Sequence, residues 1–237
     1  GTVVKGNTEI SSFSLEGEIK SVTTGDGQVY TADAIILATG GRSRTLGVPG
    51  EDTFKGRGIS YCATCDGDFF TGKEIVVVGG GNSALEEAVS LTKYATRVTV
   101  VHQFDHFQAF QYAVDEAKAN PKISFVMSST IASFYGQEKL EGVKIKNLAT
   151  GGETDFRTDG VFIFIGYVPN TEWLRGRVNM NERDEIIVGA DMSTNVEGVF
   201  SAGDANAKRY RQVTTAVADG TIAALAAADY LHSQKRK

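Results

Sequence analysis

The chain has 237 residues and a formal net charge of -5, with 41% hydrophobic and 22% charged residues. This composition is typical of a soluble globular protein, and its acidic balance disfavours a nucleic-acid partner, which normally meets a basic face. No run reaches the roughly 18 apolar residues of a membrane helix, no leader peptide is visible, and two cysteines make no disulfide scaffold, so we expect no membrane partner and a cytoplasmic location.

The first 37 residues show alternating apolar and polar positions broken by glycine-rich turns. The stretches "GTVVKG", "EISSFSLEGEIKSVTT" and "QVYTADAIILATGG" predict antiparallel strands. Within the last of them, "AIILATG" is apolar throughout and predicts a fully buried strand that ends at Gly40.

From Lys73 the pattern changes: short apolar runs alternate with segments whose apolar residues recur at helical spacing. The runs "KEIVVV", "RVTVV" and "KISFVMSS" predict parallel strands. Between them, "SALEEAVSLTKYA" and "FQAFQYAVDEAKAN" carry apolar residues at helical spacing. Together these segments predict a β-α-β-α-β unit.

The chain from Ile131 onward predicts strands followed by one long helix. The runs "IASFY", "KLEGVKIKNLAT", "ETDFR" and "GVFIFIG" predict a meander of strands. The segment from "GVFSAGD" to "AALAAADYL" predicts a strand, a loop and an alanine-rich helix.

A glycine-rich turn lies between the first of the parallel strands and the first of the helices. Gly79-x-Gly81-x-x-Ala84 follows the pattern of a dinucleotide-binding turn: Gly79 permits the tight turn, Gly81 lets the backbone approach a pyrophosphate, and Ala84 lets the helix pack on the strand. Asn82 and Ser83 open the helix, whose free N–H groups would face the phosphates. The strand–turn–helix context makes this signal strong.

The end of the next strand should identify the nucleotide. An acid there binds a ribose 2′-OH, whereas an arginine accommodates a 2′-phosphate. The sequence places His102, Gln103 and Phe104 at this position, with Asp105 a few residues on. The choice between NADP(H) and NAD(H) therefore stays open.

Cys62 and Cys65, the only cysteines, form a CxxC pair followed at once by Asp66. A structural zinc site needs four ligands, and the three histidines show no matching spacing, so we expect no metal site. A redox dithiol fits better than a structural disulfide in a reducing compartment. Asp66 is either a proton donor and acceptor for the dithiol or a helix-capping acid. A dithiol beside a dinucleotide fold calls for a flavin between them.

Several of these motifs together resemble the bacterial-type (low-molecular-weight) thioredoxin reductases. The resemblance rests on "GRGISYCATCDGDFFTGKEIVVVGGGNSALEEAVSL", "AIILATGG", "FIFIGYVPNT" and the segment from "GVFSAGD" to the final helix, and it covers essentially the whole chain. It implies an α/β fold with two Rossmann-like, three-layer nucleotide-binding domains. The FAD-binding domain would be discontinuous, over residues 1–44 and 167–237, and the pyridine-nucleotide domain with the CxxC would span residues 45–166.

The resemblance also implies roles for individual residues. Cys65 would be the flavin-side thiol, Cys62 the thiol that attacks the thioredoxin disulfide, and Asp66 the acid that serves them. The FAD site would be lined by residues from three segments, namely Thr39 and Gly40, Gly203 and Asp204, and Arg211, Gln212 and Val213. The nucleotide site would comprise Gly79, Gly81, Asn82, Ser83, Ala84 and His102.

Two departures from the family pattern accompany the resemblance. The family's own N-terminal GxGxxG segment for FAD is not present in these residues, so the FAD domain is expected to be incomplete at its N-terminus. The family's HRRxxxR signature for NADPH reads "HQFDHFQ" here, with every arginine replaced.

The expected function is flavin-dependent reduction of thioredoxin or a thioredoxin-like protein by a homodimer. The alternatives are the same fold with ferredoxin, a deazaflavin or NADH as the donor, or a flavin-free nucleotide-domain fragment without activity.

Overall fold

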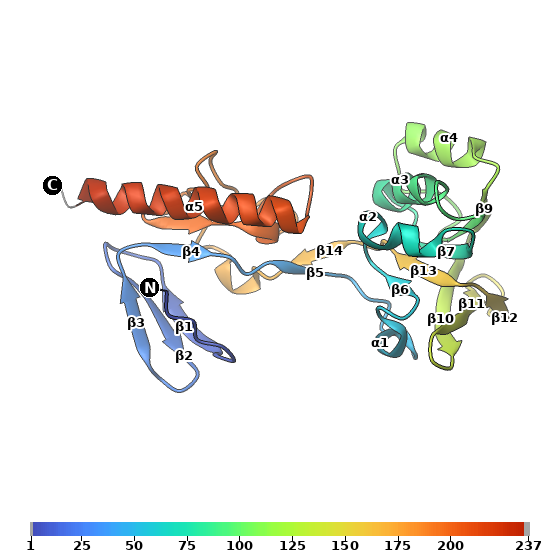
Figure 1. The fold of residues 1–237 in the computed structure, drawn as a ribbon, viewed down its shortest axis with the longest axis horizontal. Coiled ribbons are helices and arrows are strands. Elements are labelled where there is room, and N and C mark those ends of the chain that lie inside the picture. The colour runs from blue at the N-terminus through green and yellow to red at the C-terminus, as the bar shows by residue number, and fades with distance from the viewer. Residues whose placement is uncertain (1, 235–237) are drawn as a thin grey trace. The chain divides into compact units, whose positions relative to one another are not determined.

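The computed structural model describes residues 2–234 and divides into two compact units. Unit 1 comprises Gly1–Arg42 and Val168–Lys237, and unit 2 comprises Ser43–Tyr167. The chain passes between them at β5 (Gly41–Ser43) and at β14 (Tyr167–Pro169), two strands that pair with each other (Figure 1). The cofactor assigned above to each domain stays a prediction.

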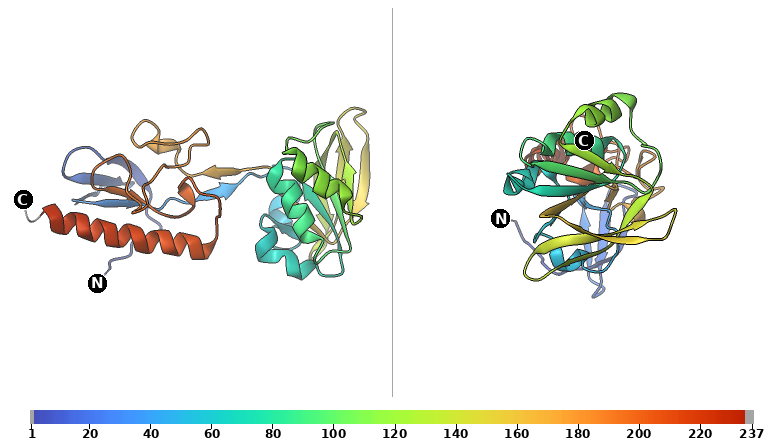
Figure 2. Two further views of the ribbon diagram at one scale, coloured as in Figure 1. Left: turned by 90° about the horizontal axis from the view of Figure 1, so that it is seen from above. Right: turned by 90° about the vertical axis from the view of Figure 1, so that its right-hand side faces the viewer.

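Unit 2 is built on a five-stranded parallel sheet. Its strands are β6 (Ile59–Ser60), β13 (Gly160–Ile163), β7 (Glu74–Val78), β8 (Arg97–Val101) and β9 (Ile123–Val126), in that spatial order. Helices α3 (Asn82–Leu91) and α4 (Gln111–Ala119) cover one face (Figure 2). After an exposed first residue, the strands β7 and β8 are buried throughout because both faces are covered.

The other face of this sheet carries an antiparallel meander of β10 (Ser129–Gly136), β11 (Leu140–Asn147) and β12 (Glu153–Arg157). Alternate residues of β7 point to opposite faces: Val77 packs with the helices, whereas Val76 and Val78 pack with the meander. Unit 2 is therefore a helix–sheet–sheet sandwich of three layers, and the predicted α/β, Rossmann-like class is confirmed.

Unit 1 combines a small antiparallel sheet with a parallel pair and a long helix. The sheet consists of β1 (Ile10–Ser14), β2 (Lys20–Thr24) and β3 (Val29–Ala32), and the pair of β4 (Ile35–Leu37) and β15 (Val199–Ser201). Helix α5 (Val213–Gln234) packs on β15 through Ala223 and Ala227, whose small side chains let the backbones approach. The shorter elements are α1 (Glu51–Phe54), α2 (Ala63–Asp66) and the 3₁₀ turns η1 (Gly67–Phe70), η2 (Glu172–Leu174) and η3 (Gly203–Ala205).

Three expectations about local structure were wrong. "GVFIFIG" does not continue the meander, because its residues 160–163 form β13 between β6 and β7 in the parallel sheet. "GTVVKG" forms no strand within its described residues, and Val3 and Val4 are 81% and 86% exposed. The strand β4, which was predicted to be fully buried, is buried only in part, since Ile36 is 40% exposed and Leu37 is 5% exposed.

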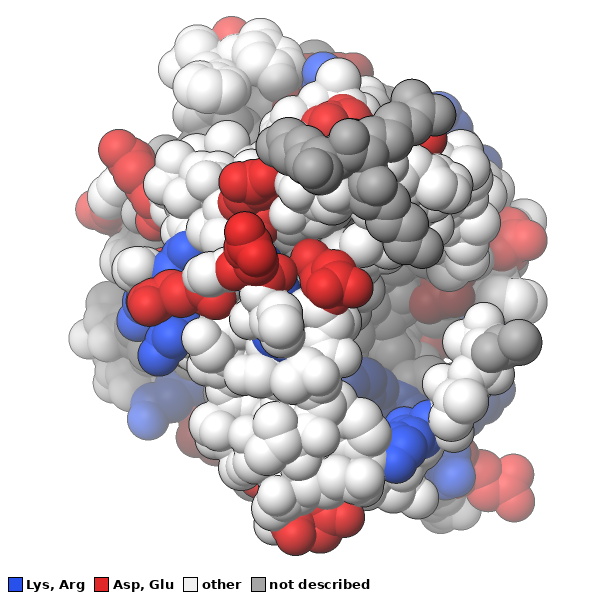
Figure 3. Space-filling model, turned by 90° about the vertical axis from the view of Figure 1, so that its left-hand side faces the viewer, with Lys and Arg blue, Asp and Glu red and all other residues white. Residues whose placement is uncertain are grey.

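The face of the molecule drawn in Figure 3 is mixed in charge, since acidic side chains gather near its centre and basic ones lie beside them. None of the helices that the structure describes combines the length and apolar character needed to cross a bilayer.

Candidate redox and nucleotide sites

The two cysteines form a disulfide in a short turn that follows β6. Cys62 precedes α2 and caps it, since its Sγ accepts a hydrogen bond from the Cys65 N–H at 3.2 Å. The Asp66 N–H closes the same turn on the Cys62 carbonyl at 3.2 Å. Cys62 is half-buried and Cys65 is exposed, so the pair is open to a reacting partner. An N–H donor aimed at Cys62 Sγ would stabilise a thiolate there once the disulfide is reduced.

The acid beside the dithiol is held by a residue that the sequence analysis missed. Ser60, the last residue of β6, donates its hydroxyl to Asp66 Oδ2 at 2.6 Å. Its oxygen also accepts the Cys62 N–H at 3.1 Å. The only sequence signal was its position two residues before the CxxC, which by itself does not distinguish it from any strand serine.

A second carboxylate, that of Glu51, contacts Tyr61, which lies between Ser60 and Cys62 in the chain. Glu51 is 3% exposed and accepts three hydrogen bonds, from the N–H groups of Leu46 and Gly47 at 3.1 and 2.7 Å and from the Tyr61 hydroxyl at 2.7 Å. Burial, and then the Glu51 hydrogen bond, raise the pKa of Tyr61 above its ordinary value. The phenol therefore stays a donor to Glu51 throughout the neutral range.

The glycine-rich turn after β7 has the geometry of a dinucleotide cradle. Gly79 has φ = 136°, and a β-carbon there would lie 2.4 Å from the Phe164 carbonyl oxygen and 2.9 Å from Ala84 Cβ. A β-carbon on Gly81 would instead meet nothing within 4 Å. The turn is thus closed where it packs on the fold and open in front of Gly81, the space that a pyrophosphate would need.

The loop after β8 folds back over this turn. The Gln108 N–H donates to the Gly80 carbonyl at 2.9 Å, and the Phe110 N–H donates to Asn82 Oδ1 at 2.7 Å. Asn82 thus ties the start of α3 to the start of α4. Ser83 is exposed at the same turn and Ala84 is buried beneath it, so the predicted nucleotide residues lie together.

The ring of His102 is buried against Gly80 of this turn, so it is not free to reach a ligand. It is 4% exposed, its ring would lie 2.4 Å from a β-carbon on Gly80, and its Nε2–H donates to the His106 carbonyl at 3.1 Å. Its ring stacks on Phe107 with centroids 5.9 Å apart. Burial lowers the pKa of His102 below its ordinary value. Among residues 2–234 no three His, Cys, Asp or Glu side chains gather as metal ligands.

In unit 1, two of the predicted FAD segments meet where β4 and β15 end. The Ala202 N–H donates to the Leu37 carbonyl at 2.9 Å, which brings residue 203 and the Thr39 segment to one edge of the parallel pair. Gly203 has φ = 81° and Gly40 has φ = 61°, so both turns suit glycine. Thr39 Oγ1 is buried without a hydrogen-bond partner among the described residues. An unpaired buried hydroxyl at a strand end fits a polar ligand, as FAD would be.

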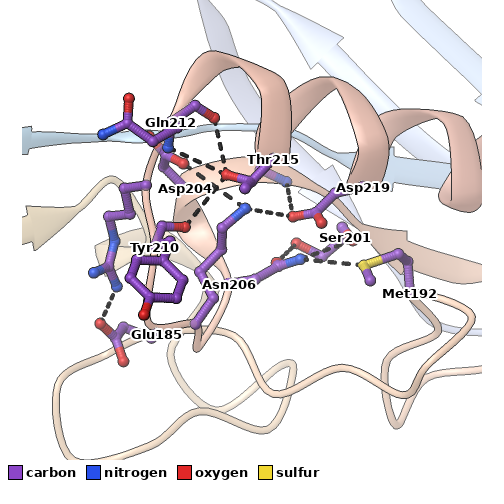
Figure 4. A network of polar contacts seen from close by, with 12 residues as sticks. Glu185, Met192, Ser201, Asp204, Asn206, Tyr210, Gln212, Thr215 and Asp219 are labelled. Atoms are coloured by element: carbon purple, nitrogen blue, oxygen red, sulfur yellow. Dashed lines mark hydrogen bonds and ion pairs between the residues drawn. The ribbon is translucent and has the colours of Figure 1, made fainter. Parts of the chain in front are cut away.

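The segment that follows is held by a polar network at the start of α5 (Figure 4). Asp219 accepts the Gly203 N–H at 3.1 Å and pairs with Lys208 at 2.7 Å, while Lys208 lies 3.9 Å from Asp204. The Thr215 hydroxyl donates to the Gln212 carbonyl at 2.9 Å and accepts the Gln212 N–H at 3.2 Å. These contacts fix the backbone at residues 203 and 212 and hold the Asp204 carboxylate near Lys208.

Glu185 holds the predicted Arg211. The two side chains form an ion pair, and Asn181 donates to the other Glu185 oxygen at 2.6 Å. Val213, the third residue of that prediction, is exposed at the first position of α5. Asp219 and Glu185 were not predicted; the signal for Asp219 was a lone acid in the small-residue stretch "TTAVADG".

Comparison with known proteins gives consistent matches over almost the whole chain. The model of the family described as pyridine nucleotide-disulphide oxidoreductase matches residues 2–220. A thioredoxin reductase of Peptoclostridium acidaminophilum is 44% identical over 231 residues, which cover 95% of this chain and 73% of that protein. A protein of Clostridium pasteurianum, described as a 34.2 kDa protein in the rubredoxin operon, is 43% identical over 94% of this chain and 72% of its own length.

The fold agrees with solved structures as well as the sequence does. The crystal structure of thioredoxin reductase from Streptococcus pyogenes superposes with a TM-score of 0.90 at 41% identity, covering 95% of this chain and 74% of that one. Sequence and fold therefore agree on the same relatives, and the sequence identity of 41–44% is higher than that of proteins that share only a fold.

Proposed function

Since this chain belongs to the pyridine nucleotide-disulphide oxidoreductase family, among the thioredoxin reductases, we propose that it reduces the disulfide of thioredoxin through Cys62 and Cys65. The observation that carries the proposal is the half-exposed Cys62–Cys65 disulfide with Asp66 held beside it in the same turn. The predicted roles of these residues are part of the proposal.

The chemistry is thiol–disulfide exchange. The reduced Cys62 thiolate attacks one sulfur of thioredoxin, forming a mixed disulfide and releasing the other sulfur as a thiolate. Cys65 then attacks the Cys62 sulfur, releasing the second thioredoxin thiolate and re-forming the Cys62–Cys65 disulfide. Two electrons leave the dithiol, and its two protons end on the two thioredoxin thiols, with the Asp66 carboxylate carrying one of them.

The structure supports Cys62 as the attacking thiol. Its Sγ accepts the Cys65 N–H, and no equivalent donor to Cys65 Sγ is found among the described residues. A thiolate is stabilised by such a donor, so Cys62 is the better nucleophile near neutral pH.

The family implies a flavin and a nicotinamide cofactor. We propose that FAD is held by Thr39 and Gly40, by Gly203 and Asp204, and by Arg211, Gln212 and Val213. When bound, FAD supplies the two-electron chemistry that connects a nicotinamide to a dithiol. The unpaired Thr39 hydroxyl supports this assignment.

For the nicotinamide nucleotide we propose the turn at Gly79, Gly81 and Asn82–Ala84, with His102 beneath it. No lysine or arginine lies between residues 102 and 112, so this loop offers no cation to a 2′-phosphate. That composition supports NADH over NADPH. A ferredoxin donor, a homodimeric assembly and a cytoplasmic location stay predictions.

Cysteine substitutions test the proposal. Cys65→Ser leaves an attacking thiol without its resolving partner, so it should accumulate a mixed disulfide with oxidised thioredoxin, seen as a mass increase that dithiothreitol reverses. Cys62→Ser should form far less. Turnover retained by either variant would contradict the proposed function, and trapping by Cys62→Ser alone would reverse the two roles.

A further inference from the structure

Ser60 occupies a central position in the turn that carries the dithiol. It is 5% exposed, ends β6 and precedes Cys62 by two residues. Its oxygen lies 2.6 Å from Asp66 Oδ2, 3.1 Å from the Cys62 amide nitrogen and 3.3 Å from the Cys62 carbonyl oxygen. One hydroxyl therefore contacts both the attacking cysteine's backbone and the neighbouring acid.

The single proton of this hydroxyl has one favoured acceptor. A hydroxyl donates once and accepts through its remaining lone pairs. Of the two oxygens within reach, the carboxylate oxygen is nearer and charged, and such hydrogen bonds are the stronger ones. The proton of Ser60 thus points at Asp66, while the Cys62 N–H supplies a donor to the Ser60 oxygen. The chain of contacts runs from the Cys62 amide through Ser60 to the Asp66 carboxylate.

This hydrogen bond restricts the rotation of the Asp66 side chain. Asp66 ends α2, and its neighbour Cys65 is exposed. Ser60 is fixed from the other side by its place in β6, which pairs with β13. The hydroxyl therefore connects the carboxylate at the end of α2 to a buried strand.

We infer that Ser60 is a positioning residue for thiol–disulfide exchange, which holds the Asp66 carboxylate in the orientation that serves the Cys62–Cys65 dithiol. The inference rests on the proposed function for the role of Asp66. Ser60 itself forms and breaks no bond. In the exchange the proton that Asp66 carries passes to a product thiolate, and the Ser60 hydroxyl keeps its own proton throughout.

A double-mutant cycle on the dithiol half-reaction tests this inference without any cofactor. The 237-residue protein is reduced chemically, freed of reductant and mixed with an excess of a disulfide, and re-formation of Cys62–Cys65 is followed by quenched alkylation and mass. Two oxidants are used, oxidised thioredoxin and oxidised glutathione, because each releases an alkyl thiolate that takes up a proton near neutral pH. The variants are Ser60→Ala, Asp66→Asn and the double variant.

The expected result is non-additive. A positioned acid contributes about 10²-fold or more, so Asp66→Asn should slow exchange by about that factor, and a misplaced acid by part of it. Ser60→Ala alone should slow the reaction about tenfold, and in the Asp66→Asn background it should change the rate less than about twofold. The pH dependence of the rate in Ser60→Ala should approach that of Asp66→Asn.

Control variants separate positioning from folding. Ser129 is an equally buried serine of unit 2 whose hydroxyl donates to the Met127 carbonyl, so Ser129→Ala should leave the rate within twofold. Ser60→Thr retains the hydroxyl and should stay within about threefold of the parent. If Ser60→Ala does not fold, Ser60→Thr takes its place in the rate comparison.

The other results of the double-mutant cycle count against the role of Ser60 or against the proposed function. Equal losses from Ser60→Ala in both backgrounds, no loss at all, or a folded Ser60→Thr as slow as Ser60→Ala would overturn the inference. Parent protein that reacts with the small disulfide and not with thioredoxin would refute the proposed function, while the cycle would still be read with the small disulfide.

Discussion

Removing the Tyr61 hydroxyl should loosen the region that precedes the dithiol. Tyr61→Phe deletes one of the three donors to the buried Glu51 carboxylate and changes little else in shape. The other two donors, the N–H groups of Leu46 and Gly47, remain. We expect unit 2 to lose stability without losing its fold.

The magnitude follows from the charge and burial of the acceptor. A hydrogen bond to a charged group contributes about 1.5–3 kcal/mol, and two retained N–H donors keep part of the compensation for Glu51. The lower end, about 1.5–2 kcal/mol, is therefore expected. In a Glu51→Gln background the acceptor is neutral, and the same Tyr61→Phe change should cost only about 0.5–1 kcal/mol.

Native-state hydrogen exchange confines the measurement to unit 2. The amides of Val76 and Val77, buried in β7, report its opening free energy as urea is added. Tyr94→Phe is the matched control, because Tyr94 is 39% exposed and its hydroxyl has no hydrogen-bond partner among the described residues. That control should change the opening free energy by less than about 0.5 kcal/mol.

Two results would refute this reasoning. A Tyr61→Phe cost no larger than that of Tyr94→Phe would show that the hydroxyl contributes nothing net to Glu51. An equal cost in the parent and in Glu51→Gln would show that the effect comes from packing of the ring rather than from the charged acceptor.

Two further predictions concern the nucleotide turn. Burial lowers the pKa of His102, so the unfolded chain binds a proton first as pH falls below about 6.5, and the free energy of unfolding should drop from there until the folded pKa is passed. His102→Asn should remove this part of the loss, measured by urea unfolding across pH 4–8, and an unchanged loss in His102→Asn would exclude His102 as its source. Gly81→Ala places a methyl in open space, so the melting temperature should stay within about 2 °C of the parent's, as it should for Gly6→Ala. The affinity for NADH, measured by calorimetry, should fall tenfold or more because the methyl occupies the space of the pyrophosphate. Unweakened binding would show that the pyrophosphate lies elsewhere.

The parallel core of unit 2 was predictable because strands, helices and the glycine turn each carry a local signal. The three apolar runs from residue 73 onward and the helices between them appear as predicted, with boundaries moved by a few residues. The strand β13 was also predicted as a strand, but its place in the parallel sheet was not, because its partners cannot be read from its own residues. "GVFIFIG" has the unbroken apolar character of a doubly covered strand, yet it follows a meander that it was expected to continue.

The candidate site divides in the same way. CxxC-D and GxGxxA were recognisable because their chemistry depends on residues close in sequence. Glu185 and Asp219 were not, since each contacts a residue remote in sequence: Glu185 pairs with Arg211 from a distant loop, and Asp219 accepts the Gly203 N–H from the second turn of α5. Ser60 lies close to the CxxC in sequence, but nothing in the sequence showed that its hydroxyl donates to Asp66. Isolated polar residues of this kind look like ordinary surface until the contacts are known.

The placement of β13 has a consequence for how this protein is made. β6 and β7 are neighbours along the chain, but β13 separates them in the sheet, and its residues leave the ribosome last of the five strands. Until β13 has been synthesised, β6 lacks the strand with which it pairs, and the turn that carries the cysteines follows a strand without its partner. Unit 2 can therefore close only after residue 163 has emerged, so the nascent thiols are exposed before the acid beside them is fixed in place.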